Sequence, residues 1–278
     1  MSDTAAVYPQ SAPRRLRIDD RYLAPIFITC ILLVGQFYYH ILESYQNTVL
    51  AIITSIGMEL ALGKMFTGKW PHWASAYISG ISVGILVRSP FLWPFALCSA
   101  IAITSKYVIR YKGRHLWNPS NLGISSLLFL APAYVASLSI QFGNNIAPIA
   151  AIWVLGSFII YRLRRFHITA TYVASFIAFA FLRSLIVHDP FLSEISPLTG
   201  PVFQLYIFFM ITDPKTTVHS KRGQMLVAFL IAFAENFFRL AGIVHAPYYA
   251  LCLVGPTAMF IDITMTSRQK TALQQASL

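Results

Sequence analysis

Charged residues are scarce in this sequence, and acidic residues are the scarcest of them. Only 11% of the 278 residues are charged, with 10 Asp and Glu against 21 Lys and Arg. Hydrophobic residues make up 56%, and the mean hydropathy of +0.62 exceeds that of an ordinary soluble domain. We therefore expect an all-α, polytopic membrane protein. No compact basic region suits nucleic acid, so the formal net charge of +11 indicates cytoplasmic loops and contact with membrane lipid.

Cysteine is also rare, which argues against a disulfide framework or a cysteine-rich metal site. Cys30, Cys98 and Cys252 each lie in an apolar run without Cys-x-x-Cys spacing. We predict that all three pack in the apolar interior. Residues 1–20 are polar and basic, and no clear small-residue cleavage site follows them. We interpret them as a cytoplasmic tail rather than a signal peptide.

Apolar segments that can lie within a bilayer occur along the rest of the chain. We predict ten of them, near residues 22–42, 48–66, 74–88, 91–109, 119–140, 146–161, 167–187, 197–212, 225–242 and 246–265. With the N-terminus inside, Arg88, Arg183 and Arg239 are the exceptions among the 21 Lys and Arg, and the others fall on the cytoplasmic side. This distribution predicts cytoplasmic termini and location in the cytoplasmic (inner) membrane.

The segments are expected to form two inverted five-helix repeats, because each half has a short segment that opens on a small-polar pair. These pairs are Ser79-Gly80 and Thr199-Gly200. The basic link from Arg162 to His167 marks the middle of the chain. We place a cytoplasmic tail at 1–21, the first repeat at 22–161, the second repeat at 162–266 and a second cytoplasmic tail at 267–278.

A small-residue face is predicted in residues 73–90. Gly80 and Gly84 are four residues apart and lie beside Ser79 and Ser82. Such a face lets either a neighbouring helix or a planar ligand approach the backbone closely. The sequence leaves both possibilities open.

Two asparagines stand out in residues 113–126. Asn118 suits the N-cap of a helix whose first turn holds Pro119. Asn118 and Asn121 could also donate to a carbonyl or ring nitrogen of a ligand where water does not compete. The alternative is that they fix the backbone of a buried loop.

A short apolar helix with polar ends is predicted in residues 197–212. Pro201 suits its first turn, and the amides near Thr199 and Gly200 would form a positive helix end suited to an anionic or hydrogen-bonding ligand. At the inner end, Asp213-Pro214 stops the helix. Asp213 could pair with Lys215, cap a following turn or simply mark a loop.

Ionisable residues inside the predicted spans give a further indication. Glu235 and Arg239 are four residues apart and can pair on one helix face, which offsets the cost of placing them in lipid. Glu59 and Asp262 could lie on an ion path. Structural pairing is the stronger interpretation, with Glu59 close to Lys64 and Asp262 close to the inner interface.

These stretches together resemble the membrane subunit RnfD of the Rnf electron-transport complex and its relative NqrB of the sodium-pumping NADH:quinone oxidoreductase. The resemblance covers roughly residues 70 to 265 and implies a ten-helix inverted repeat. The corresponding residues are Ser75, Ala76, Ser79, Gly80 and Pro90, then Trp117-Asn118-Pro119, then Thr212-Asp213-Pro214.

The chain departs from that family at the residue that carries its covalent flavin. In the family a threonine in a Ser-Gly-Ala-Thr motif holds FMN through a phosphoester bond. Here the corresponding position is Val202 or Phe203, and neither has a hydroxyl group, whereas Thr199 lies one turn earlier. This altered motif resembles the UnbU type of RnfD-like proteins, and it argues against a covalent FMN.

The resemblance implies a subunit of a membrane oxidoreductase that binds flavin (FMN or riboflavin) or quinone non-covalently and receives electrons from a redox partner protein or other subunits. The implied binding residues are Ser79, Gly80, Asn118, Asn121, Thr199 and Gly200, with Thr212, Asp213, Glu235 and Arg239 as further site residues. Two alternatives stay open. One is a transporter or channel for a small solute or ion, and the other is an assembly subunit without redox activity.

Overall fold

The computed structural model describes residues 44–137 and 146–276, and also the helical positions 25, 26, 28–30, 32, 33, 36 and 37. The predicted tail at 1–21 and most of segment 22–42 lie outside the described residues. In chain order the elements are α2 (Tyr45–Thr67), α3 (Ala74–Leu86), α4 (Trp93–Val108), β1 (Arg110–Tyr111), β2 (Arg114–His115), α5 (Pro119–Leu130), α6 (Ile146–Arg162), α7 (Phe166–Val187), α8 (Phe191–Ile195), the 3-10 helix η1 (Ser196–Thr199), α9 (Pro201–Leu205), the π-helix η2 (Tyr206–Met210), α10 (Lys221–Leu240) and α11 (Ala246–Ala276).

The prediction of an all-α membrane protein is confirmed at this level. The described chain is helical apart from loops and the hairpin of β1 and β2. Among the described residues, four helices are long and apolar enough to cross a membrane, namely α2, α7, α10 and the part of α11 from Ala246 to Gln269. The same residues include three shorter apolar helices, at Ala74–Leu86, Pro119–Leu130 and Ile149–Arg162. The ten segments and the inverted repeat remain predictions.

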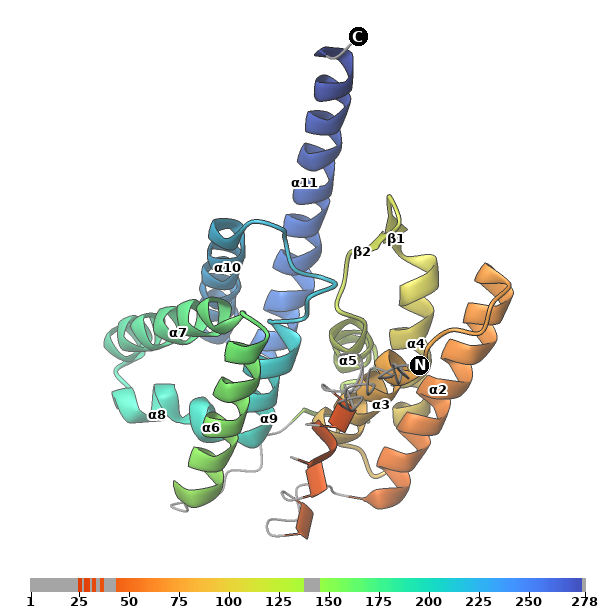
Figure 1. Ribbon diagram of the computed structural model, residues 1–278. Helices are drawn as coiled ribbons and strands as arrows, with labels where there is room; N and C mark the ends of the chain where they lie inside the picture. The colour runs from red at the N-terminus through yellow and green to blue at the C-terminus, as the bar shows by residue number, and fades with distance from the viewer. Residues whose placement is uncertain are drawn as a thin grey trace, which may run out of the picture.

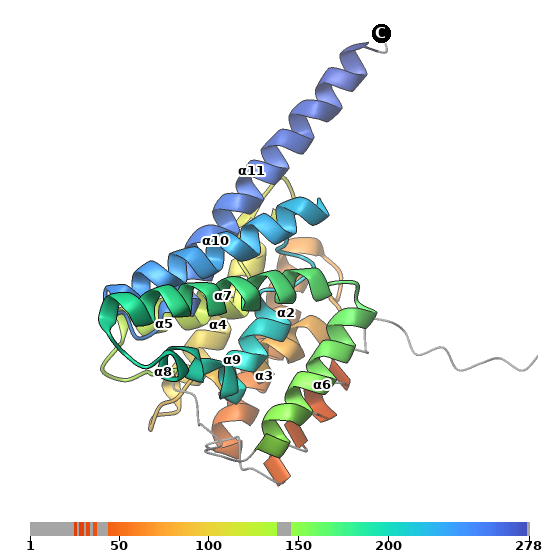
Figure 2. The ribbon, with the colours of Figure 1, turned by 90° about the vertical axis from the view of Figure 1, so that its left-hand side faces the viewer.

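The helices form two groups that lie side by side (Figure 1). In the first group α2 packs against α3 and α4, and α4 packs against α5. In the second group α7 packs against α10, and α6 packs against α9 and η2. Helix α11 packs against α10 and α5 and so joins the groups, and its C-terminal part projects beyond the other helices (Figures 1 and 2).

Glycines allow close helix contact in both groups. A Cβ atom on Gly80 would lie 2.6 Å from the Cα of Ile52, and one on Gly84 would lie 2.9 Å from the Cα of Thr48. The small-residue face of α3 is therefore covered by the backbone of α2. In the second group Gly156 of α6 receives the ring of Phe208, which a Cβ would approach to 2.5 Å.

Several predicted helix ends are confirmed, and two are wrong. Pro119 and Pro201 lie in the first turns of α5 and α9. Helix α5 ends at Leu130 rather than near 140, because Pro132 disfavours a helical conformation at the preceding residue. Helix α11 continues to Ala276, beyond the predicted end at 265 and through residues interpreted as a tail.

The prediction that all three cysteines are buried is only partly confirmed. Cys98 is buried, Cys252 is half-buried and Cys30 is exposed. Exposure of Cys30 is compatible with an apolar surrounding, because the exposed surface of a membrane helix faces lipid.

Candidate functional site

The two most specific sequence stretches meet in the structure. Asn118 is the N-cap of α5, as predicted, and its Oδ1 accepts a hydrogen bond of 3.0 Å from the backbone N–H of Asn121. Its Nδ2 donates to Asp213 Oδ2 at 3.3 Å and lies 3.5 Å from the carbonyl oxygen of Met210. A single side chain thus begins α5 and binds the segment that follows η2.

Asp213 stabilises the turn after η2. Its Oδ1 accepts from the backbone N–H of Lys215 at 3.1 Å, and its Oδ2 accepts from Thr216 Oγ1 at 2.8 Å. Of the three possible roles of Asp213, the structure shows the turn cap. Thr212 donates its hydroxyl to the carbonyl oxygen of Phe208, so this hydroxyl serves the local helix.

Asn121 connects α5 to α11. It is 1% exposed, and its Nδ2 donates to the carbonyl oxygen of Tyr248 at 3.1 Å. Trp117 adds a second connection, because its Nε1 donates to the carbonyl oxygen of Cys252 at 2.9 Å. The Oδ1 of Asn121 is buried and has no partner among the described residues. This oxygen can therefore accept a further hydrogen bond, and it lies next to the contact between the helix groups.

A histidine and an arginine near this junction have lowered pKa values. Burial lowers the pKa of His115, which immediately precedes the loop to α5, to about 4, and the nearby charges of Arg110 and Lys215 act in the same direction. Burial also lowers the pKa of Arg165, and the carboxylate of Asp213 opposes that shift. Asp213 is therefore an anion close to several cations.

The predicted pair in the first group, Ser79 and Gly80, contacts protein. Ser79 donates its hydroxyl to the carbonyl oxygen of Ser75 at 3.1 Å, within α3. Gly80 faces the backbone of α2 at Ala51 and Ile52. Helix packing, rather than a planar ligand, occupies this face in the structure.

The corresponding pair in the second group, Thr199 and Gly200, lies where η1 meets α9. Thr199 is exposed and donates its hydroxyl to the carbonyl oxygen of Ser196 at 2.7 Å. Gly200 is the N-cap of α9. Val202 and Phe203, which stand where the resembling family has its flavin-bearing threonine, are 4% and 6% exposed and belong to the hydrophobic core.

A buried ionic cluster lies between α7, α9 and α10. The predicted pair of Glu235 and Arg239 is confirmed, with 2.8 Å between Arg239 Nη2 and Glu235 Oε1. The hydroxyl of Tyr172 donates to Glu235 Oε2. The guanidinium of Arg239 also lies over the rings of Phe176 and Phe203, 5.4 and 5.9 Å from their centroids. Glu235 is 0% exposed, so these partners replace the hydrogen bonds that its carboxylate would make to water.

Arg183 extends this cluster and was not among the predicted site residues. It is 2% exposed, its Nε lies 2.6 Å from Glu194 Oε2, and its Nη1 donates to Asn236 Oδ1 at 3.0 Å. Its guanidinium lies 5.5 Å from the ring centroid of Phe176. Phe176 therefore contacts two guanidinium groups. An arginine inside an apolar segment is the sequence signal that identifies such a residue.

The pairing suggested for Glu59 is wrong. Glu59 pairs with Lys106 of α4, at 3.0 Å, rather than with Lys64. Lys64 lies more than one turn farther along α2, near its exposed end, and its Nζ donates to the carbonyl oxygen of Gly68. Asp262 is paired as expected, since its Oδ2 lies 3.5 Å from Arg114 Nη1 and 2.6 Å from His219 Nδ1.

The residues proposed for a flavin do not fit one in this arrangement. Ser79, Asn118 and Thr199 direct hydrogen bonds to protein groups, and Gly80 is covered by α2. A cavity between α3 and α9–η2, lined by residues such as Ser82 and Leu205, holds about 10 Å³. That volume suits one water molecule rather than a three-ring system. Within the described chain, no group of three or more His, Cys, Asp or Glu is placed to hold a metal ion.

Comparison with known proteins gives one informative similarity. No family model matches the chain. Over 119 residues it is 29% identical to one component, designated D, of the ion-translocating oxidoreductase complex of Shewanella frigidimarina (strain NCIMB 400), a match that covers 42% of this chain. The match spans about a third of that relative's length, 34%.

Proposed function

We propose that this chain is a membrane subunit of an ion-translocating electron-transport complex, similar in role to RnfD and NqrB. The similarity to a component of such a complex supports this function, and so do the four helices that can cross a membrane. The contact of Asn118 with Asp213 is the structural observation that carries it. It joins the Asn-Pro and Thr-Asp-Pro elements on which the family resemblance rests.

An inverted repeat forms part of this proposal. The order of packing is similar in the two groups, since α2 packs against α4 and α4 against α5, while α7 packs against α10 and α10 against α11. Shorter elements lie between the first two long helices of each group, α3 between α2 and α4, and α8, η1, α9 and η2 between α7 and α10. This correspondence favours a repeat boundary between α5 and α6 over one at the basic link after residue 161. Helix α6 would then correspond to segment 22–42.

The chain's orientation and cofactor complete the proposal. The Lys and Arg distribution supports cytoplasmic termini in the cytoplasmic membrane. We place electron delivery in partner subunits, because Val202 and Phe203 offer no hydroxyl for a covalent flavin. A flavin or quinone bound without a covalent bond would require α3 and α9 to separate, so no chemical step is assigned to it. The UnbU type is the family branch that this altered motif favours.

The proposal is tested by purifying the full chain together with the membrane proteins that accompany it. We expect iron-sulfur or flavin-containing subunits to copurify, and we expect Asn118→Ala to reduce quinone reduction by the assembled complex. Ser220→Ala is the matched control, because Ser220 also caps a helix, α10, through Gly223. The absorbance spectrum of the isolated chain tests the cofactor separately. The electron-transport role would be refuted if no redox subunit copurified with the chain and if Asn118→Ala and Ser220→Ala gave equal rates of quinone reduction.

A transporter or channel is the second candidate function. Charged groups inside apolar helices often mark ion or substrate paths, and Glu235, Arg239 and Arg183 are such groups. Under this function the protein in liposomes should move an ion or small polar solute without any redox partner, and Glu235→Gln should change the rate. Transport that depends on electron delivery would instead support the first function.

A further inference from the structure

A basic cleft opens where α6 ends and where α7 and α10 begin. Its volume is about 940 Å³. Its walls are formed by the link between α6 and α7 and by the start of α10, and the lining residues are Tyr161, Arg162, Leu163, Arg164, Arg165, Phe166, His167, His219, Lys221 and Gln224. The cleft is separate from the ionic cluster around Glu235.

The cleft is lined by four Lys and Arg residues and, among the described residues, by no Asp or Glu. Arg162, Arg164, Arg165 and Lys221 form no ion pair with another described residue. His219, which also lines the cleft, pairs with Asp262 at 2.6 Å, and the carboxylate of Asp213 acts on Arg165. The Nη1 atom of Arg165 is buried and has no hydrogen-bond partner in the described chain. A buried guanidinium nitrogen without an acceptor can donate a charge-assisted hydrogen bond to an anion that enters the cleft.

The walls of the cleft are held in place by hydrogen bonds. His167 Nε2 lies 2.6 Å from Gln224 Oε1, and Gln224 Nε2 donates to the carbonyl oxygen of Val218 at 2.8 Å. The backbone N–H of Arg165 donates to the carbonyl oxygen of Ile160 at 2.7 Å. The start of α7 is thereby tied to the start of α10, so the cationic side chains are presented by a fixed backbone.

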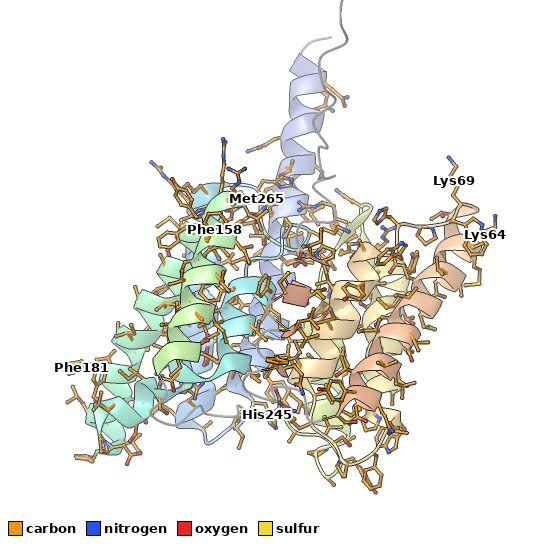
Figure 3. All side chains as sticks on the ribbon, turned by 60° about the horizontal axis from the view of Figure 1, so that its bottom comes forward. Lys64, Lys69, Phe158, Phe181, His245 and Met265 are labelled. Carbon is orange, nitrogen blue, oxygen red and sulfur yellow. The ribbon has the colours of Figure 1, made fainter. Side chains whose placement is uncertain are left out.

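Apolar side chains lie directly beside these cations. Tyr161, Leu163 and Phe166 line the same cleft and are 74%, 51% and 48% exposed. Phe158, one turn earlier on α6, is 57% exposed (Figure 3). A soluble anion would gain nothing from this apolar surface, whereas a molecule with an anionic head and hydrocarbon chains would contact both parts.

We propose that this cleft binds the phosphate group of an anionic phospholipid, with guanidinium groups on the phosphate and acyl chains along the exposed face of α6. Guanidinium groups suit this ligand because two parallel N–H donors match two phosphate oxygens. A soluble phosphate compound presents the same oxygens, and the experiment distinguishes the two sources. The inference concerns lipid recognition and does not depend on the proposed electron-transport role.

The test uses the full chain purified in a neutral detergent and titrated with phosphatidylglycerol or phosphatidylcholine. Native mass spectrometry counts bound lipid. We expect phosphatidylglycerol to bind at least tenfold more tightly than phosphatidylcholine, and Arg164→Gln/Arg165→Gln to abolish that preference. Lys69→Gln/Arg268→Gln is the control, because it removes the same charge from exposed residues outside the cleft. Lys69 lies beyond the C-terminal end of α2, away from α6 (Figure 3).

Each outcome decides between the possibilities. If the preference for phosphatidylglycerol fell equally in the two double variants, the lipid would be attracted to positive charge in general, and the site would be overturned. Equal binding of phosphatidylglycerol and phosphatidylcholine to the wild type would also overturn it. Pyrophosphate is the soluble probe. If it binds the wild type but not Arg164→Gln/Arg165→Gln, and phosphatidylglycerol does not bind in the same way, the phosphate site is kept and its ligand is soluble. If Arg164→Gln/Arg165→Gln fails to fold, Arg162→Gln/Lys221→Gln removes two other cations of the cleft, one from the end of α6 and one from the start of α10, and should also abolish the preference.

Discussion

At the scale of single residues, short polar side chains hold distant parts of this apolar chain together. Asn118 caps α5 and donates to Asp213, and Asn121 donates to the carbonyl oxygen of Tyr248. Asn118 is half-buried, whereas Asn121 is 1% exposed, so water hardly competes for Asn121, and an unsatisfied polar group at such a position costs several kcal/mol. These asparagines therefore support the contact between the two helix groups whether or not a ligand binds nearby.

The dual role of Asn118 leads to a quantitative prediction. Asn118→Ala should lower the free energy of unfolding by about 2 kcal/mol, because it removes an N-cap worth about 1 kcal/mol and a hydrogen bond of similar worth. Ser220→Ala should lose the cap contribution alone, about 1 kcal/mol. Reversible unfolding in mixed detergent micelles measures both.

A double-mutant cycle separates the cap from the contact with Asp213. Asn118→Ala and Asp213→Ala should show a coupling energy of about 0.5–1 kcal/mol, since each removes one partner of the same hydrogen bond. Additive effects would show that the two side chains do not interact in the folded protein.

At the scale of elements, close packing of α2 on α3 depends on glycine. Gly80→Ala should destabilise the protein by about 2 kcal/mol or more, because the added Cβ would overlap the backbone of Ile52 and force the helices apart. Gly57→Ala is the matched control, since no atom lies within 4 Å of its Cβ position. That control should be neutral or more stable by up to about 1 kcal/mol. Similar thermal stability of both variants would show that α2 and α3 are not packed this way.

Elements whose ends are set by local chemistry were predictable from sequence, and those set by distant contacts were not. Asn118 and Pro119 define a helix start because capping depends on neighbouring residues alone. The pairing of Glu59 with Lys106 crosses 47 residues, so sequence spacing could not reveal it. The π-helix from Tyr206 to Met210 has no local sequence signal either, and it lies within the short element that carries the family resemblance.

At the scale of the whole molecule, the orientation in the membrane follows from charge distribution and can be tested directly. In a variant without native cysteines, Lys69→Cys and Asp189→Cys place one thiol in the loop after α2 and one in the loop after α7. The predicted topology puts Lys69 inside and Asp189 outside. A membrane-impermeant maleimide should therefore label Asp189→Cys in right-side-out vesicles and label Lys69→Cys only after lysis. The reverse pattern would invert the whole arrangement.

The length of α11 sets how far the protein reaches from the lipid. Its 31 residues extend for roughly 46 Å at about 1.5 Å per residue, against a hydrocarbon core of about 30 Å. Roughly 16 Å of helix, about three turns, must then stand outside the core even if the helix begins at its far boundary. A soluble protein could bind this projecting part of α11 without contacting the lipid headgroups. A fluorophore at Arg268 would report how far α11 extends above the membrane.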